Sequence, residues 1–223
     1  MPKGLEIVTV ALDVDPEAAR PWIERAKPQH PSLIDSCHLV DEVFGITNVP
    51  NGVWIDEEGM IVRPAEPAAP ERPPRPDRPA RPAEPQPELP EYTKQVLEEA
   101  RKIRLDAHAY TDALRDWAER GSASRFALSP DQVIERSGNR GADESLAAAN
   151  FEMGQWLWAN GHRDRAPRYW REAHRLFPSN WTYKRQAWIL ADPQQGPTEL
   201  YDSDWLSDVR KVGAENYYPP LNL

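Results

Sequence analysis

The chain has 223 residues and a formal net charge of -9 at pH 7. This acidic balance argues against a nucleic-acid partner, because phosphates are bound by basic patches. No apolar run approaches the roughly 18 residues that a membrane-spanning helix needs. Residues 1–15 lack the basic start and long apolar core of a signal peptide. We therefore expect no membrane span and a cytoplasmic protein; an extracytoplasmic location would require a start upstream of Met1.

Residues 1–64 are expected to form an α/β portion. The near-continuous apolar run from Leu5 to Val14 is typical of a parallel strand that is buried on both faces. Asp15 can cap the helix that follows, and Pro16 suits the first turn of that helix. This helix should stop before Pro28.

The rest of this portion continues the alternation of strands and helices. Residues 30–35 form a short extended piece, and a second helix over residues 37–44 is closed by Gly45. A β-hairpin is expected from 53–55 and 60–62, with an acidic turn between the two strands. The predicted order is therefore β-α-β-α-β-β.

The hairpin and the loop before it carry a specific pattern. Pro50 stands just before the first hairpin strand, where a proline donates no ladder hydrogen bond. The pattern resembles the cis-proline segment of thioredoxin-like domains, in particular the TlpA/ResA family of thiol-disulfide oxidoreductases. The matching residues are Gly45, Ile46, Asn48, Val49, Pro50, Val53, Trp54, Ile55, Asp56, Gly59, Ile61 and Val62. Asn51 departs from the family, which usually has threonine after the proline.

The resemblance implies a role for this loop, but the chain also departs from the family in one large respect. In the family the loop holds a substrate polypeptide beside the redox cysteines, so Val49, Pro50 and Asn51 would form the substrate-binding loop. The family also begins with a strand and a helix that carry W-C-x-x-C or a variant of it. This chain starts after that point, so no catalytic residue can be assigned. Whether it is an enzyme therefore stays open, and we expect no oxidoreductase activity from it alone.

Cys37 is the single cysteine, which excludes an internal disulfide and any C-x-x-C pair. A thiol near a helix N-terminus can act as a nucleophile, whereas the alternative is a small, partly buried residue without chemistry. Thiol exchange also needs a resolving cysteine, which favours the second interpretation. Neighbouring His30 and His38 do not complete a zinc set with Cys37, so we expect neither a metal nor another cofactor.

A proline-rich stretch over residues 65–90 marks the expected domain boundary. Proline recurs there every two or three residues, with alanine and charged residues between. Such a sequence forms neither a helix nor a central strand, and it buries almost nothing. We expect an extended, polyproline-like spacer. A docking peptide for a proline-binding domain is the alternative.

Residues 91–141 are expected to be helical. One apolar stripe runs through residues 91–120 and predicts a single long helix. Its latter half could return across the spacer to complete the first domain, and the sequence does not decide this. Ser129 and Pro130 should begin a further short helix.

Residues 142–192 contain small residues that suit a pair of packed helices. Gly154 and Ala166 are small enough for two antiparallel helices to approach closely, with Trp170 in the seam between them. This spacing resembles a tetratricopeptide repeat. About one and a half repeats are present, which cannot form a free solenoid, so they must pack on another element. We expect a partner groove lined by Trp156, Trp158, Tyr169 and Tyr183, and a plain helical hairpin with an aromatic core is the alternative.

The sequence thus predicts an α/β plus all-α protein with a partial thioredoxin-like sheet, a proline-rich linker and a helical region. The tail over residues 193–223 is expected to hold one weak helix and to tuck onto a surface of the protein. The expected function is that of a TlpA/ResA-type redox protein, inactive in this chain, with a polypeptide or a protein thiol as partner. The alternative is a non-enzymatic, polypeptide-binding module that uses the repeat-like helices.

Overall fold

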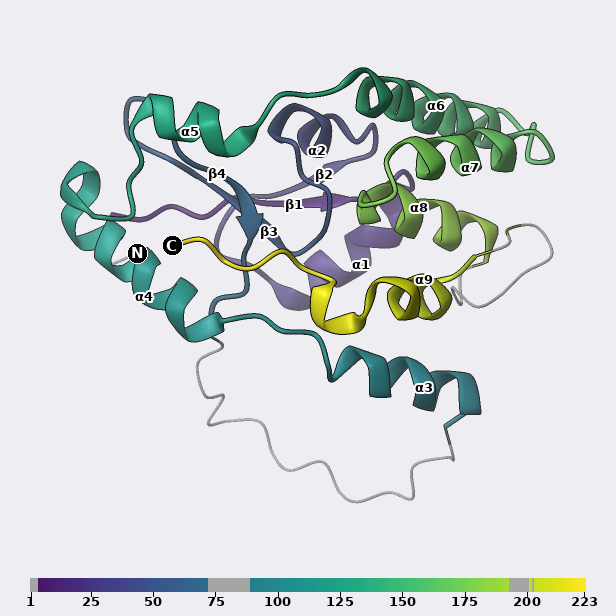
Figure 1. The fold of residues 1–223 in the computed structure, drawn as a ribbon, viewed down its shortest axis with the longest axis horizontal. Coiled ribbons are helices and arrows are strands. Elements are labelled where there is room, and N and C mark those ends of the chain that lie inside the picture. The colour runs from purple at the N-terminus through teal and green to yellow at the C-terminus, as the bar shows by residue number, and fades with distance from the viewer. Residues whose placement is uncertain (1–3, 72–88, 193–200, 202) are drawn as a thin grey trace.

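The computed structural model describes residues 4–71, 89–192, 201 and 203–223. Its first elements follow the predicted β-α-β-α-β-β order (Figure 1). They are β1 (Thr9–Leu12), α1 (Pro16–Ala26), β2 (Ser32–Asp35), α2 (Leu39–Phe44), β3 (Asn51–Ile55) and β4 (Ile61–Pro67). The remaining described elements are helical, which confirms a mixed α/β and all-α chain at the level of class.

The single helix predicted over residues 91–120 is wrong, because two helices occupy this range. The Asp106 carboxylate accepts a hydrogen bond from the amide of Ala109, so it caps the second helix and ends the continuity of the apolar stripe. The helical elements are α3 (Glu91–Ala100), α4 (Ala107–Arg120), η1 (Gly121–Ala123), α5 (Pro130–Ser137), α6 (Ala142–Ala159), α7 (Ala166–Leu176), α8 (Trp181–Ala191), α9 (Trp205–Val212) and η2 (Ala214–Asn216).

The four strands of the described residues form two separate sheets. β1 and β2 are parallel, with Thr9 opposite Ser32 and Leu12 opposite Asp35. β3 and β4 are antiparallel, with an irregular register around Trp54. No described strand joins the two pairs. Every residue of β1 and β2 is at least partly exposed, so the expectation of a strand buried on both faces is wrong for β1.

Strand β4 extends into the predicted spacer. Residues 65–67 were expected to be linker, but β4 runs to Pro67, and Ala68 donates its amide hydrogen to the carbonyl of Pro50 at 3.2 Å. Prolines are compatible with a strand where the missing N–H lies outside the ladder, as on an edge strand. The extended spacer predicted over 72–88 lies outside the described residues.

Helix α4 packs on the β3–β4 hairpin and forms the smaller of two apolar cores. The indole N–H of Trp54 donates to the hydroxyl of Tyr110 at 3.0 Å. The ring of Trp54 also stacks on Trp117, with 4.9 Å between ring centroids. The buried members of this core are Trp54, Val62, Tyr110, Ala113 and Phe126. The second half of the predicted long helix therefore covers the hairpin.

Helices α6 to α9 enclose the larger core, which is rich in aromatic side chains. At the crossing of α6 and α7, Gly154 lies directly against the ring of Trp170, and Trp170 is fully buried. A side chain at position 154 would collide with this ring, so the small residue permits the close approach that the sequence predicts.

The chain after residue 200 belongs to this core as well. Trp205, Leu206 and Val209 of α9 are buried, as are Tyr217 and Tyr218 beyond it. Figure 1 shows this last stretch, in yellow, running from α9 across the middle of the molecule towards β3 and α4. The tail thus packs on the helical core and carries the helix α9, while residues 193–200 lie outside the described residues.

Candidate functional site

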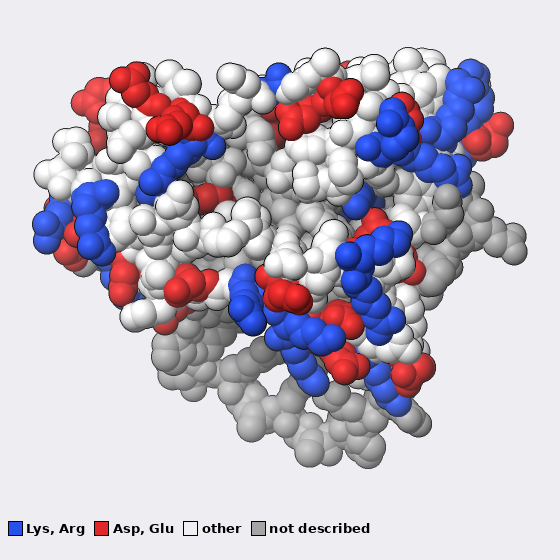
Figure 2. Space-filling view, viewed as in Figure 1, with Lys and Arg blue, Asp and Glu red and all other residues white. Residues whose placement is uncertain are grey.

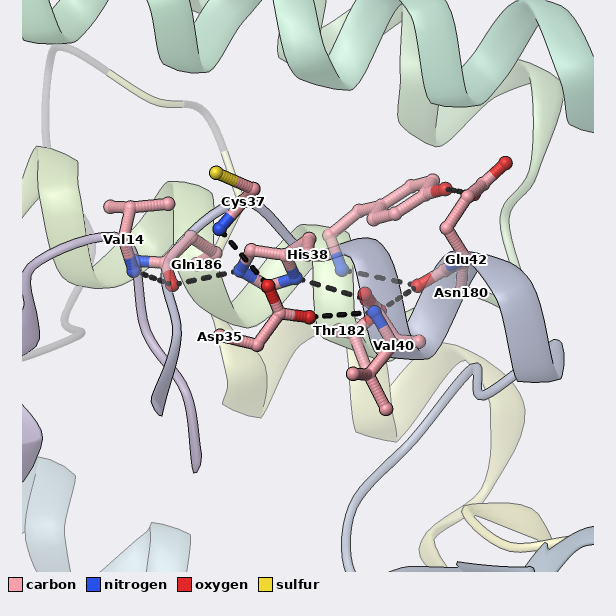
Figure 3. Close-up of polar contacts among 11 residues, drawn as sticks. Val14, Asp35, Cys37, His38, Val40, Glu42, Asn180, Thr182 and Gln186 are labelled. Carbon is pink, nitrogen blue, oxygen red and sulfur yellow. Dashed lines mark hydrogen bonds and ion pairs between the residues drawn. The ribbon is translucent and has the colours of Figure 1, made fainter. Parts of the chain in front are cut away.

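A buried polar network joins α2 to α8 (Figure 3). We call it the His38 network; its members are Val14, His38, Asp41 and Gln186. The imidazole of His38 contacts Asp41 Oδ2 through Nδ1 at 3.0 Å and Gln186 Oε1 through Nε2 at 3.2 Å. His38 is 5% exposed and Asp41 2% exposed. The network thus ties the α/β portion to the helical core away from water.

The hydrogen bonds fix the protonation state of His38. The backbone N–H of Val14 can only donate, so the Gln186 atom that it meets at 3.2 Å is the carbonyl oxygen. The same oxygen faces Nε2 of His38, and a carboxylate faces Nδ1. Both ring nitrogens must therefore donate, which favours the imidazolium.

The electrostatic surroundings of His38 agree with this assignment. Burial lowers the pKa of His38, but the hydrogen bond and charge of Asp41, the bond to Gln186 and the charge of Asp35 more than offset it. The net result is a raised pKa. The packing adds a ring contact, since Phe151 meets the imidazole edge-on at 5.1 Å. His38 itself adopts φ 55°, a left-handed conformation, just before α2 begins.

Asp35 organises the backbone at the start of α2. Its carboxylate accepts hydrogen bonds from the amides of Val40 at 2.6 Å and Cys37 at 3.2 Å. Cys37 is exposed, and Figure 3 shows its sulfur directed away from the ring of His38. The imidazolium is thus not arranged as a base for the thiol. Within the described residues, no cluster of His, Cys, Asp and Glu side chains is arranged to hold a metal ion.

Tyr183 lies in the core and not in a groove. It is 3% exposed, stacks on Phe151 with 4.2 Å between ring centroids, and donates its hydroxyl hydrogen to Glu42 at 2.8 Å. Burial and the neighbouring Glu42 carboxylate raise the pKa of Tyr183, so it remains a donor. Arg140 pairs with Glu42 from the other side. The inclusion of Tyr183 in the predicted partner groove is therefore wrong, because its ring packs on α6 inside the core and its hydroxyl contacts α2.

The other three predicted groove residues do not share one surface. Trp156 is 57% exposed and stacks on His162. Trp158 packs instead on Trp170 of the large core, with 5.3 Å between ring centroids. Tyr169 is partly buried against the same core. Among these residues Trp156 alone is largely open to solvent.

The predicted substrate-binding loop lies between the hairpin and the N-terminus of α8. We call residues 47–51 the proline loop. Its Val49–Pro50 peptide bond is cis, and Pro50 is exposed. The carbonyl of Thr47 accepts the amide hydrogens of Trp181 at 2.6 Å and Thr182 at 3.2 Å. The side-chain oxygen of Asn51 is enclosed and has no hydrogen-bond partner among the described residues.

Another stretch of the same chain, outside any helix or strand, lies on the proline loop. We call Tyr217–Leu223 the C-terminal segment. The hydroxyl of Tyr218 donates to the carbonyl of Val49 at 2.6 Å, and the side-chain amide of Asn48 donates to the carbonyl of Tyr217 at 3.1 Å. Burial raises the pKa of Tyr218 to about 12, which keeps its hydroxyl protonated at neutral pH.

The far end of the C-terminal segment is held by two arginines. Arg63 Nη2 and Arg136 Nη1 both donate to the carbonyl of Asn222, at 2.7 and 2.6 Å. Arg63 is 1% exposed and is also paired with Glu66. Leu221 and Leu223 pack against the smaller core around Trp54. The segment therefore connects both cores of the protein.

A cavity of about 920 Å³ opens beside the C-terminal segment. Its lining is mostly apolar and comes from the end of β4, the connection between α3 and α4, and the segment itself. Among its wall residues are Pro67, Ile103, Leu105, Tyr110, Pro220 and Leu223. The C-terminal segment thus forms one wall of this cavity. We call the surface that the segment contacts, formed by the proline loop, Arg63, Arg136 and the smaller core, the groove.

Sequence reasoning identified the proline loop but missed what covers it. The two tyrosines and two prolines over residues 217–220 were the available signal, because aromatic side chains beside prolines suit an extended, packed segment. No local signal marks Gln186, which meets His38 from 148 positions away in the chain.

Surface charge and comparisons with known proteins do not point to a particular function. On the face shown in Figure 2, acidic and basic side chains are interspersed. Within the described residues, no helix combines the length and the apolarity that crossing a membrane requires. Comparison of the chain with protein-family models, curated proteins and solved structures gives no significant match.

Proposed function

We propose that the chain is a thioredoxin-like protein of TlpA/ResA type that binds an extended polypeptide at the proline loop and does not itself exchange thiols. The observation that carries this proposal is the contact between Val49 and Tyr218. The main-chain carbonyl of the loop already accepts a hydrogen bond from Tyr218, which lies in a segment of its own chain outside any helix or strand. A surface that holds one such segment has the chemistry to hold another.

The element order and strand pairing support the thioredoxin-like part of the proposal. A parallel β1–β2 pair with a helical crossover precedes an antiparallel β3–β4 hairpin, and α4 covers that hairpin. The two pairs stay unjoined in the described residues, as expected for a sheet of this type without a strand between β1 and β3.

The absence of thiol exchange rests on the cysteine content and geometry. Exchange proceeds through a mixed disulfide that a second thiol resolves, and Cys37 is the one cysteine. Its sulfur is also turned away from His38. We expect no turnover in an insulin-disulfide reduction assay; detectable turnover would contradict this part of the proposal.

Binding is tested with a polypeptide that has no disulfide to exchange. Fluorescein-labelled, reduced and carboxymethylated insulin B chain is titrated with the full chain, and saturable binding is measured by fluorescence anisotropy. Replacing exposed Pro50 by alanine removes ring surface from the loop and should weaken binding by about tenfold, roughly the factor that 1.4 kcal/mol gives. The control is Trp156→Ala, which changes an exposed side chain away from the loop and should bind as the unchanged chain does.

The control also tests the alternative function. A polypeptide-binding module that uses the repeat-like helices predicts the reverse sensitivity, with loss in the tryptophan variant and none at Pro50. The exposure of Trp156 is the observation that favours this second candidate. Equal binding by both variants, or no binding by any folded form of the chain, would exclude the proline loop as the site.

A further inference from the structure

Resting on the proposed function, we infer that residues 218–223 form a displaceable strap in the peptide groove, and that the groove selects segments of the same kind: a tyrosine, then prolines, then leucine. The strap would make the protein a binder that is closed by its own chain. A polypeptide with matching chemistry would open it by competition.

The groove recognises main-chain atoms of the strap. Asn222 presents a carbonyl that accepts from both Arg63 and Arg136. The buried guanidinium of Arg63 is paired with Glu66 and with the carbonyl of Phe126, and Asn222 accepts from a further N–H of Nη2. A buried N–H that is left without an acceptor is costly. Any extended segment supplies a carbonyl here whatever its side chain. These contacts therefore set the direction and register of a ligand without restricting its sequence.

The groove also recognises side chains of the strap. The ring of Tyr218 is enclosed next to Tyr217, and its hydroxyl reaches Val49. Leu221 and Leu223 contact the apolar core around Trp54. Pro219 and Pro220 lack amide hydrogens, so the stretch between the two anchors stays extended without unpaired donors. The selected ligand class is thus a short, extended, proline-containing peptide with an aromatic hydroxyl before the prolines.

Because the strap belongs to the same chain, its effective concentration at the groove is high. A short tether gives an effective concentration on the order of millimolar. A free peptide at micromolar concentration therefore competes poorly while the strap is present. The same peptide should bind well once the strap is removed, because the donors on Arg63 and Arg136 and the cavity beside α4 then face solvent.

The test compares the full chain with a chain that ends at Tyr217. The probe is a fluorescein-labelled peptide with the sequence YPPLNL, and anisotropy gives the dissociation constant. We expect the shortened chain to bind at least about tenfold more tightly than the full chain, from the loss of an intramolecular competitor. In the full chain, Tyr218→Phe keeps the ring and removes one hydrogen bond, so probe binding should tighten by about fivefold. This second variant decides the question if the shortened chain does not fold.

Matched substitutions locate the probe in the groove. In the shortened chain, Arg136→Met should weaken binding by about fivefold or more, as expected for loss of a charged donor. Arg101→Met, an exposed arginine outside the groove, should leave binding unchanged. A probe in which phenylalanine replaces the tyrosine should bind more weakly than YPPLNL, and a scrambled probe should not bind.

The outcomes separate this inference from the proposed function. If insulin B chain binds equally to the full and shortened chains and YPPLNL binds to neither, the strap is excluded while the proposed function stands. If Tyr218→Phe binds the probe no more tightly than the unchanged chain, the strap is again excluded. If neither polypeptide binds any folded form, both proposals fail.

Discussion

The helical region α6–α9 and the β1–β2 sheet differ in how each is held together. In the helical region, aromatic rings and small residues interlock, and Trp170, Ala173 and Ala187 have no exposed surface. In β1 and β2 every residue keeps some exposure, and Leu33 is 54% exposed. An isolated two-stranded sheet is at best marginally stable in water.

The difference teaches that the α/β portion depends on the helical region for its position. Its links to α8 are polar and specific: His38 and Val14 meet Gln186, Glu42 meets Tyr183, and Thr47 accepts from the first amides of α8. Hydrogen bonds of this kind contribute about 1 kcal/mol each when made and cost more when one partner is left buried and unpaired. The junction therefore fixes geometry more than it adds stability.

The largest expected effect comes from filling the helix crossing. In Gly154→Ala the new Cβ would lie 2.5 Å from Cδ1 of Trp170, in a place where the ring has no free space. Alanine is the better helix former by about 1 kcal/mol. The overlap should nevertheless outweigh this and reduce the free energy of unfolding by about 2–3 kcal/mol. Urea denaturation followed by tryptophan fluorescence measures the change.

A second variant checks the cause of that loss. Trp170→Phe shortens the ring that meets position 154, so the double variant Gly154→Ala/Trp170→Phe should be more stable than the sum of the two single losses. Strict additivity would show that the two residues are not in contact and would undo the contrast between the two regions.

Local signals predicted much of this fold, and contacts distant in sequence account for what was missed. Asp15 caps α1 with Pro16 in its first turn, Gly45 closes α2 at φ 69°, and Ser129 forms a capping box on α5, all as predicted. Each of these depends on a few neighbouring residues. The enclosure of Tyr218 against Val49 depends on positions 169 apart, so no window of sequence contains it.

The candidate site likewise has one part that the local sequence predicts and one part that depends on distant contacts. The loop Val49–Asn51 was found because its pattern is local, whereas the His38 network needed α8 to supply Gln186. The predicted groove failed at Tyr183 because an aromatic residue at helical spacing serves a core as readily as a surface. The residues that such an aromatic side chain contacts decide between these roles, and those contacts depend on the fold.

The next effect in size concerns pH and the junction. The pKa of His38 is raised in the folded chain above its ordinary value of 6.5. Folding therefore takes up a proton, and this contribution is fully present below pH 6.5 and is lost as pH rises through the raised pKa. We expect the free energy of unfolding to be lower at pH about 9 than at pH about 6.

His38→Asn should reduce this pH dependence, since asparagine accepts the left-handed conformation of position 38 but carries no titrating proton. His162→Asn changes an exposed histidine and should retain the dependence. Urea denaturation at both pH values measures it. An equal slope with pH in the unchanged chain and in His38→Asn would show that His38 is not the buried imidazolium at the junction.

The smallest expected effect lies in the β1–β2 sheet. Leu33 sits in β2 opposite Val10 and is 54% exposed, so Leu33→Thr removes little buried surface and places a good strand former there. The free energy of unfolding should change by no more than about 0.5 kcal/mol. Urea denaturation at two protein concentrations measures this change.

A loss above about 1.5 kcal/mol, on the scale of burying a whole aliphatic side chain, would mean that this face is covered in solution. The loss would then grow with protein concentration if a second copy provides the cover, because association stabilises by mass action. The contrast between an enclosed helical core and an open sheet therefore depends on Leu33 remaining nearly neutral at both concentrations.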